Sequence, residues 1–325
     1  MKRRTVLAAG AAGVAGLTGT ALAAPPAVAR PEARTARAGA ARGRAAGGRV
    51  VVYYQTQYAD DAYVSPLGLT ENGTGVTHLI VGAVHVNALD GPHAPVHLND
   101  DPPDAERYAP MWRDLGTLRG EGVPVLAMVG GAAQGSFARL DTEFDTYYPL
   151  LRDFLREYEL DGVDLDVEEE MSLAGIERVI DALRADFGGG FLITLAPVGT
   201  ALSGGGNLSG FDYERLYRDR GEAVSWFNGQ FYNGWGSLAS TASVDAIVER
   251  GLIPPEKLVA GALTAPANGG SGYVDMPTLT GTIRQLVSAH PGFGGVDGWE
   301  YFNSEPGGTS APWRWAAEVS AALNG

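Results

Sequence analysis

Short apolar segments rich in β-branched residues alternate with segments of helical periodicity from residue 50 onward. Eight of the apolar segments are typical of buried parallel strands, and they lie at 50–55, 78–86, 123–129, 162–168, 191–195, 225–232, 257–262 and 295–301. Helical patterns lie at 109–121, 145–159, 174–186, 212–220, 244–250, 278–290 and 311–323. Strand–helix alternation repeated about eight times over roughly 250 residues predicts an α/β fold, a (β/α)8 barrel formed by one domain.

The connection after the second predicted strand is the least regular part of this pattern. Residues 87–108 contain Asp90-Gly91-Pro92 and Pro102-Pro103, which predict a long loop. A doubly wound sheet is the alternative fold, and it needs a glycine-rich phosphate loop after its first strand. Thr56-Gln57-Tyr58 follows the first strand here and is not such a loop, so the sequence favours the barrel.

An unusual run of acidic residues occupies the fourth predicted strand, which reads Asp-Gly-Val-Asp-Leu-Asp-Val-Glu over 161–168. Side chains of a strand alternate between its two faces, so Asp164, Asp166 and Glu168 share one face. Three acids on one face of an otherwise apolar strand repel each other and cost desolvation free energy. Such a group is expected either to hold a proton at an unusual pKa or to bind a cation such as Ca²⁺ or Mg²⁺.

The carboxyl ends of barrel strands carry the functional groups in this fold. Asp166 and Glu168 are therefore expected at the mouth of the barrel, with Asp164 deeper. Other strand ends bring aromatic, amide and glycine residues to the same mouth, and we expect these to bind substrate: Tyr54, Gly130, Gln230, Tyr232, Asn233 and Trp299. Aromatic faces stack on the apolar faces of sugar rings, while amides and carboxylates bind their hydroxyl groups.

The charge of the chain restricts its partners. The formal net charge is −14, and residues 1–49 contain nine basic residues against one acidic residue, so the rest of the chain carries −22. A body this acidic repels the phosphate backbone of nucleic acids, which are excluded as partners. An uncharged polymer such as a polysaccharide remains compatible with it.

The N-terminus predicts export. Lys2-Arg3-Arg4 precedes an apolar run rich in Ala and Gly, and the Arg pair is similar to a twin-arginine signal peptide over residues 1–29. A Sec signal or a membrane anchor are the alternatives, but the short apolar run does not favour a stable anchor. Residues 30–48 have no apolar periodicity and predict a disordered linker before a catalytic barrel at 49–325. With no cysteine, a secreted protein of this kind depends on its core rather than on disulfides.

The acidic run resembles the fourth-strand motif of glycoside hydrolase family 18, Asp-x-x-Asp-x-Asp-x-Glu, at positions 161, 164, 166 and 168. Residues 230–233 are similar to the sixth-strand motif of the smaller plant- and fungal-type chitinases, and residues 195–197, 265–273 and 294–299 extend the resemblance over most of the predicted barrel. One position departs from it, because Met128 stands where the third strand of the family usually carries a serine that helps to hold the inner Asp.

The resemblance implies a retaining, substrate-assisted hydrolysis in which the 2-acetamido oxygen of the substrate attacks the anomeric carbon. It implies that Glu168 is the general acid and base and that Asp166 binds the acetamide N–H and shares a proton with Asp164. It further implies that Tyr232 donates to the acetamide oxygen while Gln230 and Trp299 line the same subsite. Asp161, on the opposite strand face, is interpreted as structural.

Three functions are consistent with these residues. The first is a secreted chitinase that cleaves β-1,4-linked N-acetylglucosamine (GlcNAc) polymers, and the second is an endo-β-N-acetylglucosaminidase acting on the chitobiose core of N-glycans. The third is a carbohydrate-binding barrel that has lost activity. Such proteins typically lack either the last Glu of the motif or the sixth-strand Tyr, whereas Glu168 and Tyr232 are both present here. A monomer is expected that requires no metal ion and no organic cofactor.

Overall fold

Residues 48–325 are described by the structure, which is a computed structural model. The predicted signal peptide at 1–29 and the predicted linker up to residue 47 lie outside the described residues. Among the residues that are described, no helix is long and apolar enough to cross a membrane.

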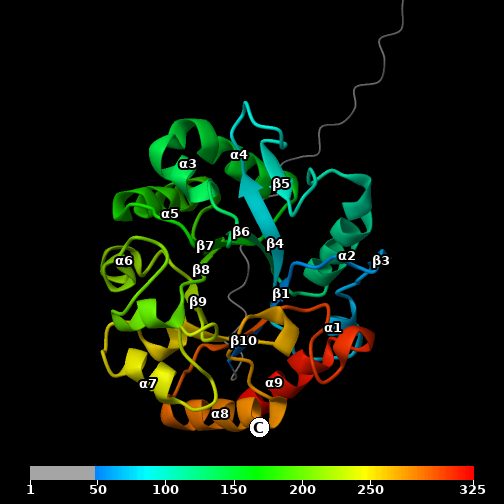
Figure 1. Cartoon of the computed structure of the whole chain (residues 1–325), viewed down its shortest axis with the longest axis vertical. Helices are drawn as coiled ribbons and strands as arrows, with labels where there is room; N and C mark the ends of the chain where they lie inside the picture. Colours follow the sequence, from blue (N-terminus) through cyan, green and yellow to red (C-terminus); the bar gives the residue numbers. More distant parts are fainter. Residues whose placement is uncertain (1–47) are drawn as a thin grey trace, which may run out of the picture. The chain divides into compact units, whose positions relative to one another are not determined.

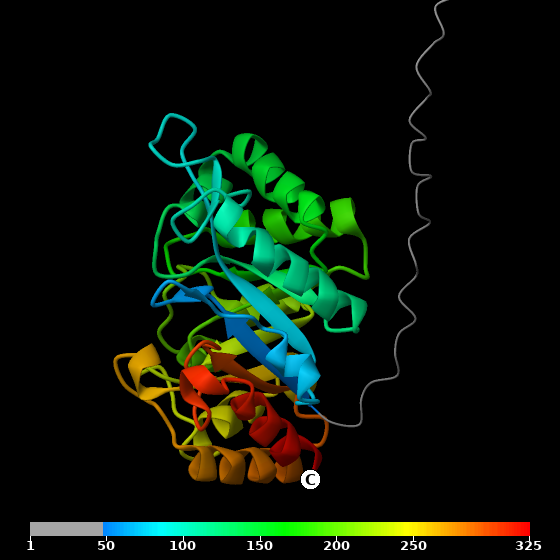
Figure 2. The same cartoon turned by 90° about the vertical axis from the view of Figure 1, so that its right-hand side faces the viewer.

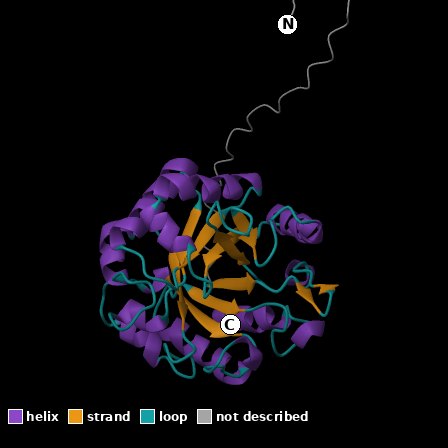
Figure 3. Cartoon of the chain, turned by 45° about the horizontal axis from the view of Figure 1, so that its top comes forward, coloured by secondary structure: helices purple, strands orange, loops and turns teal. Residues whose placement is uncertain are grey.

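Eight parallel strands close into a barrel inside a ring of helices (Figures 1 and 3), which confirms the predicted fold. The order around the barrel is β1-β11-β10-β9-β8-β7-β6-β4, and pairing of β1 with β4 closes it. This closure excludes the open doubly wound sheet. The barrel strands are β1 (Arg49–Tyr54), β4 (His78–Val86), β6 (Val125–Gly130), β7 (Gly162–Asp166), β8 (Leu192–Leu195), β9 (Trp226–Gln230), β10 (Leu258–Leu263) and β11 (Gly295–Trp299).

Seven helices occupy the predicted positions to within three residues at either end. They are α2 (Ala109–Gly120), α4 (Phe144–Glu157), α5 (Leu173–Phe187), α6 (Tyr213–Arg220), α7 (Ala242–Val248), α8 (Met276–Ala289) and α9 (Arg314–Asn324). The C-terminal helix α9 lies beside α8, along the outside of the barrel (Figure 2). Three of these helices begin with a side-chain cap, in which Ser172, Asp212 and Asp275 accept a hydrogen bond from the backbone N–H three residues later.

Shorter elements were not predicted. Two short helices, α1 (Gly68–Glu71) and α3 (Ser136–Thr142), follow β1 and β6. Strand β5 (Val96–Leu98) pairs antiparallel with β4 inside the segment expected to be a loop, and β2 (Tyr58–Ala59) pairs with β3 (Ala62–Tyr63) in a small hairpin. Short 3₁₀ turns complete the described chain: η1 (Glu106–Tyr108), η2 (Gly199–Ser203), η3 (Pro255–Lys257), η4 (Pro266–Asn268) and η5 (Gly308–Ser310).

Side-chain alternation divides the core into an outer and an inner part. Along β1, Val50, Val52 and Tyr54 belong to the large apolar cluster between the strands and the helices. Val51 and Tyr53 instead belong to a small cluster inside the barrel. The same alternation along β7 turns Val163 and Leu165 outward, and this leaves the intervening acids for the barrel interior.

Two glycines shape the end of β6. Gly130 and Gly131 have φ angles of 93° and 86°, which favour glycine over residues with a Cβ atom. A Cβ atom on Gly130 would lie 2.4 Å from the ring of Phe137 and 2.5 Å from the carbonyl oxygen of Asp166. The N–H of Gly131 donates to that carbonyl at 2.8 Å. The glycine pair therefore lets the chain turn tightly against the end of β7.

Candidate active site

A cavity of about 370 Å³ opens at the carboxyl ends of the barrel strands. Seven of the nine residues predicted for the site line it: Gly130, Asp166, Glu168, Gln230, Tyr232, Asn233 and Trp299. Asp164 lies deeper in the barrel and is fully buried, as its position on the strand predicted. The described structure therefore brings eight of the predicted residues together around one space.

The carboxyl of Asp164 is held by three donors from three other strands. The Tyr53 hydroxyl donates to Oδ2 at 2.8 Å, and the Thr194 hydroxyl and the Asn228 amide donate to Oδ1 at 2.5 and 3.0 Å. Hydrogen bonds that a carboxyl only accepts favour its ionised form. Burial raises the pKa of Asp164, and these three donors act against that increase. The arrangement therefore fits a buried carboxylate.

Asp166 and Glu168 share one donor. Gln230 Nε2 lies 3.1 Å from Asp166 Oδ1 and 3.2 Å from Glu168 Oε1, and it also donates to the carbonyl of Ala196 at 2.9 Å. Burial, followed by the charge of Glu168 and then that of Asp164, raises the pKa of Asp166 well above its usual value. Asp166 therefore retains its proton over a wide pH range above that value, beside an ionised Asp164.

Strand β7 ends at Asp166, two residues before the predicted end. The backbone N–H of Glu168 donates to the carbonyl of Asp166 at 3.2 Å, so Glu168 lies on a turn rather than on the strand. This turn projects Glu168, which is partly exposed, into the cavity beyond the buried Asp166. The alternation of a strand predicted the correct side for Glu168 but not the turn that carries it.

The prediction for Tyr54 is wrong. Its ring is fully buried in the outer core, and its hydroxyl donates to the carbonyl of Val64 at 2.6 Å. Tyr53, its neighbour, instead points into the barrel and contacts Asp164 and the ring of Trp299, whose centroid is 5.6 Å away. The two residues exchange roles because the register of β1 could not be read from a run of five apolar residues.

Tyr232 and Asn233 follow β9 at the edge of the cavity. Burial raises the pKa of Tyr232 well above its usual value, so its hydroxyl remains a neutral donor. Asn233 has a φ of 53°, and its Oδ1 accepts hydrogen bonds from the backbone of Gly270 and Ser271 at 2.9 and 3.1 Å. Asn233 thus fixes the loop after β10 against the mouth of the barrel.

Several polar residues near the site were not predicted from the sequence. Thr194 and Asn228 bind Asp164, and Trp226 donates to the amide oxygen of Asn228 at 2.7 Å. Asp297 is buried on the inner face of β11, and its position two residues before Trp299 was the signal that could have revealed it. Met128 lines the cavity as an apolar residue and supplies no donor to Asp164.

Two further acids have structural contacts. Glu300 accepts from the backbone N–H groups of Gln55 and Thr56 and from the Thr56 hydroxyl, so it fixes the end of β1. Glu169 is buried and accepts from the backbone N–H groups of Gly135 and Phe137 at the start of α3. Among residues 48–325, no group of three or more His, Asp or Glu side chains is arranged to hold a metal ion.

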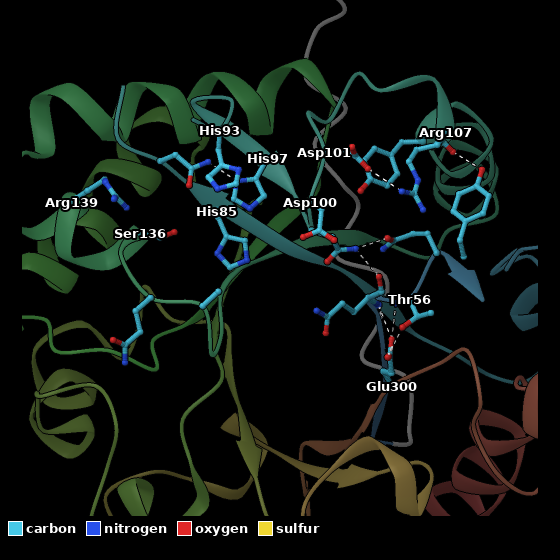
Figure 4. Close-up of a pocket in the computed structure, with 18 residues that line it drawn as sticks. Thr56, His85, His93, His97, Asp100, Asp101, Arg107, Ser136, Arg139 and Glu300 are labelled. Carbon is cyan, nitrogen blue, oxygen red and sulfur yellow. Dashed lines mark hydrogen bonds and ion pairs between the residues drawn. The ribbon is translucent and has the colours of Figure 1, made fainter. Parts of the chain in front are cut away.

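A second and larger cavity, of about 820 Å³, adjoins the first (Figure 4). Gln55, His85 and Ala133 line both cavities. One side carries three imidazoles: His97 stacks on His85 with ring centroids 4.9 Å apart, and His93 lies tilted against His97 at 5.4 Å. The other side carries Asp100, Asp101 and Arg107. Burial, followed by the charge of His97, lowers the pKa of His85 to about 4, so this imidazole is neutral at neutral pH.

Comparison with known proteins identifies the family. A fungal endo-β-N-acetylglucosaminidase from glycosyl hydrolase family 18 is 48% identical, with a TM-score of 0.80, and the match covers 85% of this chain and 98% of that one. Chitinase ChiC of Aspergillus fumigatus is 51% identical, with a TM-score of 0.76, over 85% of this chain and 99% of that one. Endochitinase 4 of Metarhizium robertsii is 24% identical over 252 residues, 64% of this chain and 72% of that protein.

No family model matches the sequence. The two solved structures nevertheless exceed 45% identity over most of both chains. The chain therefore belongs to glycoside hydrolase family 18, as the resemblance of its acidic motif predicted. It is a glycoside hydrolase.

We predict that Thr194→Val, which removes one donor from Asp164 without changing the side-chain size, raises the pKa of Asp164. A hydrogen bond to a charged group contributes about 1.5–3 kcal/mol, equivalent to about one to two pH units. The acid limb of the pH profile of kcat should therefore move to higher pH, because Asp164 is protonated sooner. Thr282→Val, at a buried threonine of α8, is the matched control and should leave the limb in place. An unchanged limb in Thr194→Val would contradict the proposed charge on Asp164.

Proposed function

We propose that this protein cleaves β-1,4 bonds between GlcNAc residues, with the substrate's own 2-acetamido group as the nucleophile. The observation that carries this proposal is the bridging of Asp166 and Glu168 by one amide nitrogen, that of Gln230. Both carboxyls also come from the end of one strand, β7, and the turn that follows it, so we infer that they lie on the same side of a sugar bound in the cavity. A double displacement by two enzyme carboxyls requires them on opposite faces of the sugar, so the nucleophile comes from the substrate.

In this mechanism, Glu168 protonates the leaving glycosidic oxygen and then accepts a proton from the attacking water. The unprotonated oxygen of Asp166 accepts a hydrogen bond from the acetamide N–H. Because Asp166 shares its proton with Asp164, the pair carries one negative charge, which stabilises the positive oxazolinium intermediate. The neutral hydroxyl of Tyr232 donates to the acetamide oxygen and directs it toward the anomeric carbon. Trp299 provides the aromatic floor of the subsite, in contact with Tyr53. No metal ion or cofactor takes part in these steps.

The first candidate substrate is chitin or its soluble oligosaccharides. The similarity to proteins named chitinases supports it, including ChiC and the Metarhizium endochitinase. We also propose that the protein is exported by a twin-arginine signal at residues 1–29 and acts outside the cell as a monomer. In this arrangement residues 30–48 link the signal to a catalytic barrel at 49–325.

We predict that Glu168→Gln reduces hydrolysis of chitotetraose by about 100- to 10,000-fold, the usual contribution of a general acid. Binding should be largely retained, because Gln has nearly the same size and still faces the amide of Gln230. Products are measured by mass spectrometry and binding by calorimetry. Glu170→Gln, at an exposed acid two residues later, serves as the control and should retain activity. Wild-type rates in the Glu168→Gln protein would contradict the assignment.

The second candidate substrate is the chitobiose core of N-glycans, and the larger cavity favours it. This cavity has more than twice the volume of the first, and its lining of His, Asp, Asn, Gln and Arg side chains suits a branched sugar rich in hydroxyl groups. A linear GlcNAc chain would not fill such a space beside the reacting subsite. The fungal relative described as an endo-β-N-acetylglucosaminidase supports the same candidate.

We predict that Asp100→Ala, at an exposed acid of the larger cavity, separates the two substrates. Loss of a hydrogen bond from a carboxylate to a sugar hydroxyl should reduce kcat/KM for a high-mannose glycoprotein by about tenfold or more. Cleavage of chitotetraose should be unchanged, because the proposal assigns this wall to the branches of an N-glycan. Asp90→Ala, in the neighbouring loop but outside the cavity lining, is the control. Equal loss on both substrates, or on neither, would contradict an N-glycan role for the larger cavity.

A further inference from the structure

Asp297 is a buried carboxyl to which neither the family motif nor the proposed mechanism gives a role. It lies on β11 opposite Gly261 of β10, and only 3% of its surface is exposed. Its Oδ2 is shielded from solvent, and no donor among residues 48–325 reaches this atom. Asp164, by contrast, has three donors. The two buried acids therefore differ in how well hydrogen bonds would stabilise a negative charge on each.

The neighbouring strand is built to accommodate this side chain. A Cβ atom on Gly261 would lie 2.8 and 3.1 Å from the two carboxyl oxygens of Asp297. The carboxyl therefore packs directly against bare backbone, in a space that a larger residue at 261 would fill. Asp297 does not line either cavity, so it does not contact a substrate bound there.

The titratable groups coupled to Asp297 are all acidic or phenolic. They are Tyr53 from β1, Asp164 and Asp166 from β7, and Tyr232 after β9, while β10 presents only Gly261. Burial, followed by the charge of Asp164, raises the pKa of Asp297 well above its usual value. A buried acid whose carboxyl oxygen has no donor takes a proton rather than a charge.

We propose that Asp297 stays protonated in the folded protein and acts as a positioning residue, which leaves Asp164 as the one negative charge of the three carboxyls. The inference for catalysis rests on the proposed function, but the proton equilibria do not depend on it.

The first test is the pH dependence of thermal unfolding in the wild type and in Asp297→Asn, which has nearly the same shape and does not titrate. A carboxyl whose pKa is raised by folding makes the folded state less stable as pH rises above the unfolded value of about 3.9, because the folded state must bind a proton that the unfolded chain releases. The variant should therefore gain stability relative to the wild type as the pH rises above about 4.5, with up to about tenfold in the unfolding constant per pH unit.

Asp153→Asn, at an exposed aspartate of α4, is the matched control and should show a difference from the wild type that is constant with pH. A constant or falling difference for Asp297→Asn would overturn the proposal, because it would mean that Asp297 is ionised in the folded protein. This measurement needs no substrate. Its failure is therefore distinct from failure of the proposed function, which product analysis tests separately.

The second test detects the proton on Asp297 directly, by an infrared titration of the carbonyl band of protonated carboxyls. The Asp166→Asn variant assigns the band of Asp166. Asp297→Asn should remove a second band, which persists well above the usual pKa of an aspartate. A spectrum that Asp297→Asn leaves unchanged would overturn the proposal, because it would mean that Asp297 carries no proton in the folded protein.

Discussion

One buried carboxylate, that of Asp164, is the constraint on which the rest of the barrel interior depends. Moving an ion of this size out of water costs several kcal/mol, which only well-placed donors can offset. The donors come from β1, β8 and β9, and the indole of Trp226 orients one of them. Four strands must therefore be in register before the charge is tolerated, which links the closure of the barrel to its chemistry.

The same charge determines the state of the groups above it. An ionised Asp164 beneath a buried Asp166 makes a second negative charge unfavourable, so Asp166 retains a proton. Gln230 then ties Asp166 to Glu168 at the cavity floor. In the proposed mechanism, these groups donate and accept protons on one side of the sugar, and the substrate itself supplies the nucleophile.

The barrel and most of its mouth could be predicted from the sequence because both follow from periodicity. Long apolar runs identify parallel strands, and the spacing of two residues identifies acids that share a face. Side-chain alternation does not reveal which residues face the barrel interior in a run such as Val50–Tyr54, because both faces of this strand are apolar. Nothing in that run distinguishes Tyr53 from Tyr54. Elements as short as α1, α3 and β5 carry too few residues for a period to be visible.

The residues that hydrogen-bond to Asp164 could not be predicted from the sequence, for a different reason. Thr194 and Asn228 lie 30 and 64 residues from Asp164 along the chain, and only the closed barrel brings them to it. The larger cavity is likewise formed by loops whose shape no local pattern encodes. Met128 was the visible departure from the family pattern, and the three donors of Asp164 explain how the chain does without a serine there.

The central claim is that the substrate's acetamido group, rather than an enzyme carboxylate, attacks the anomeric carbon. The most direct measurement compares two chito-oligosaccharides of equal length that differ only in whether the sugar on the non-reducing side of the scissile bond carries an acetamido or a free amino group. We predict cleavage of the acetylated bond, with the β-anomer as the first product seen by NMR, and no cleavage of the deacetylated one. Comparable cleavage of both would contradict the account.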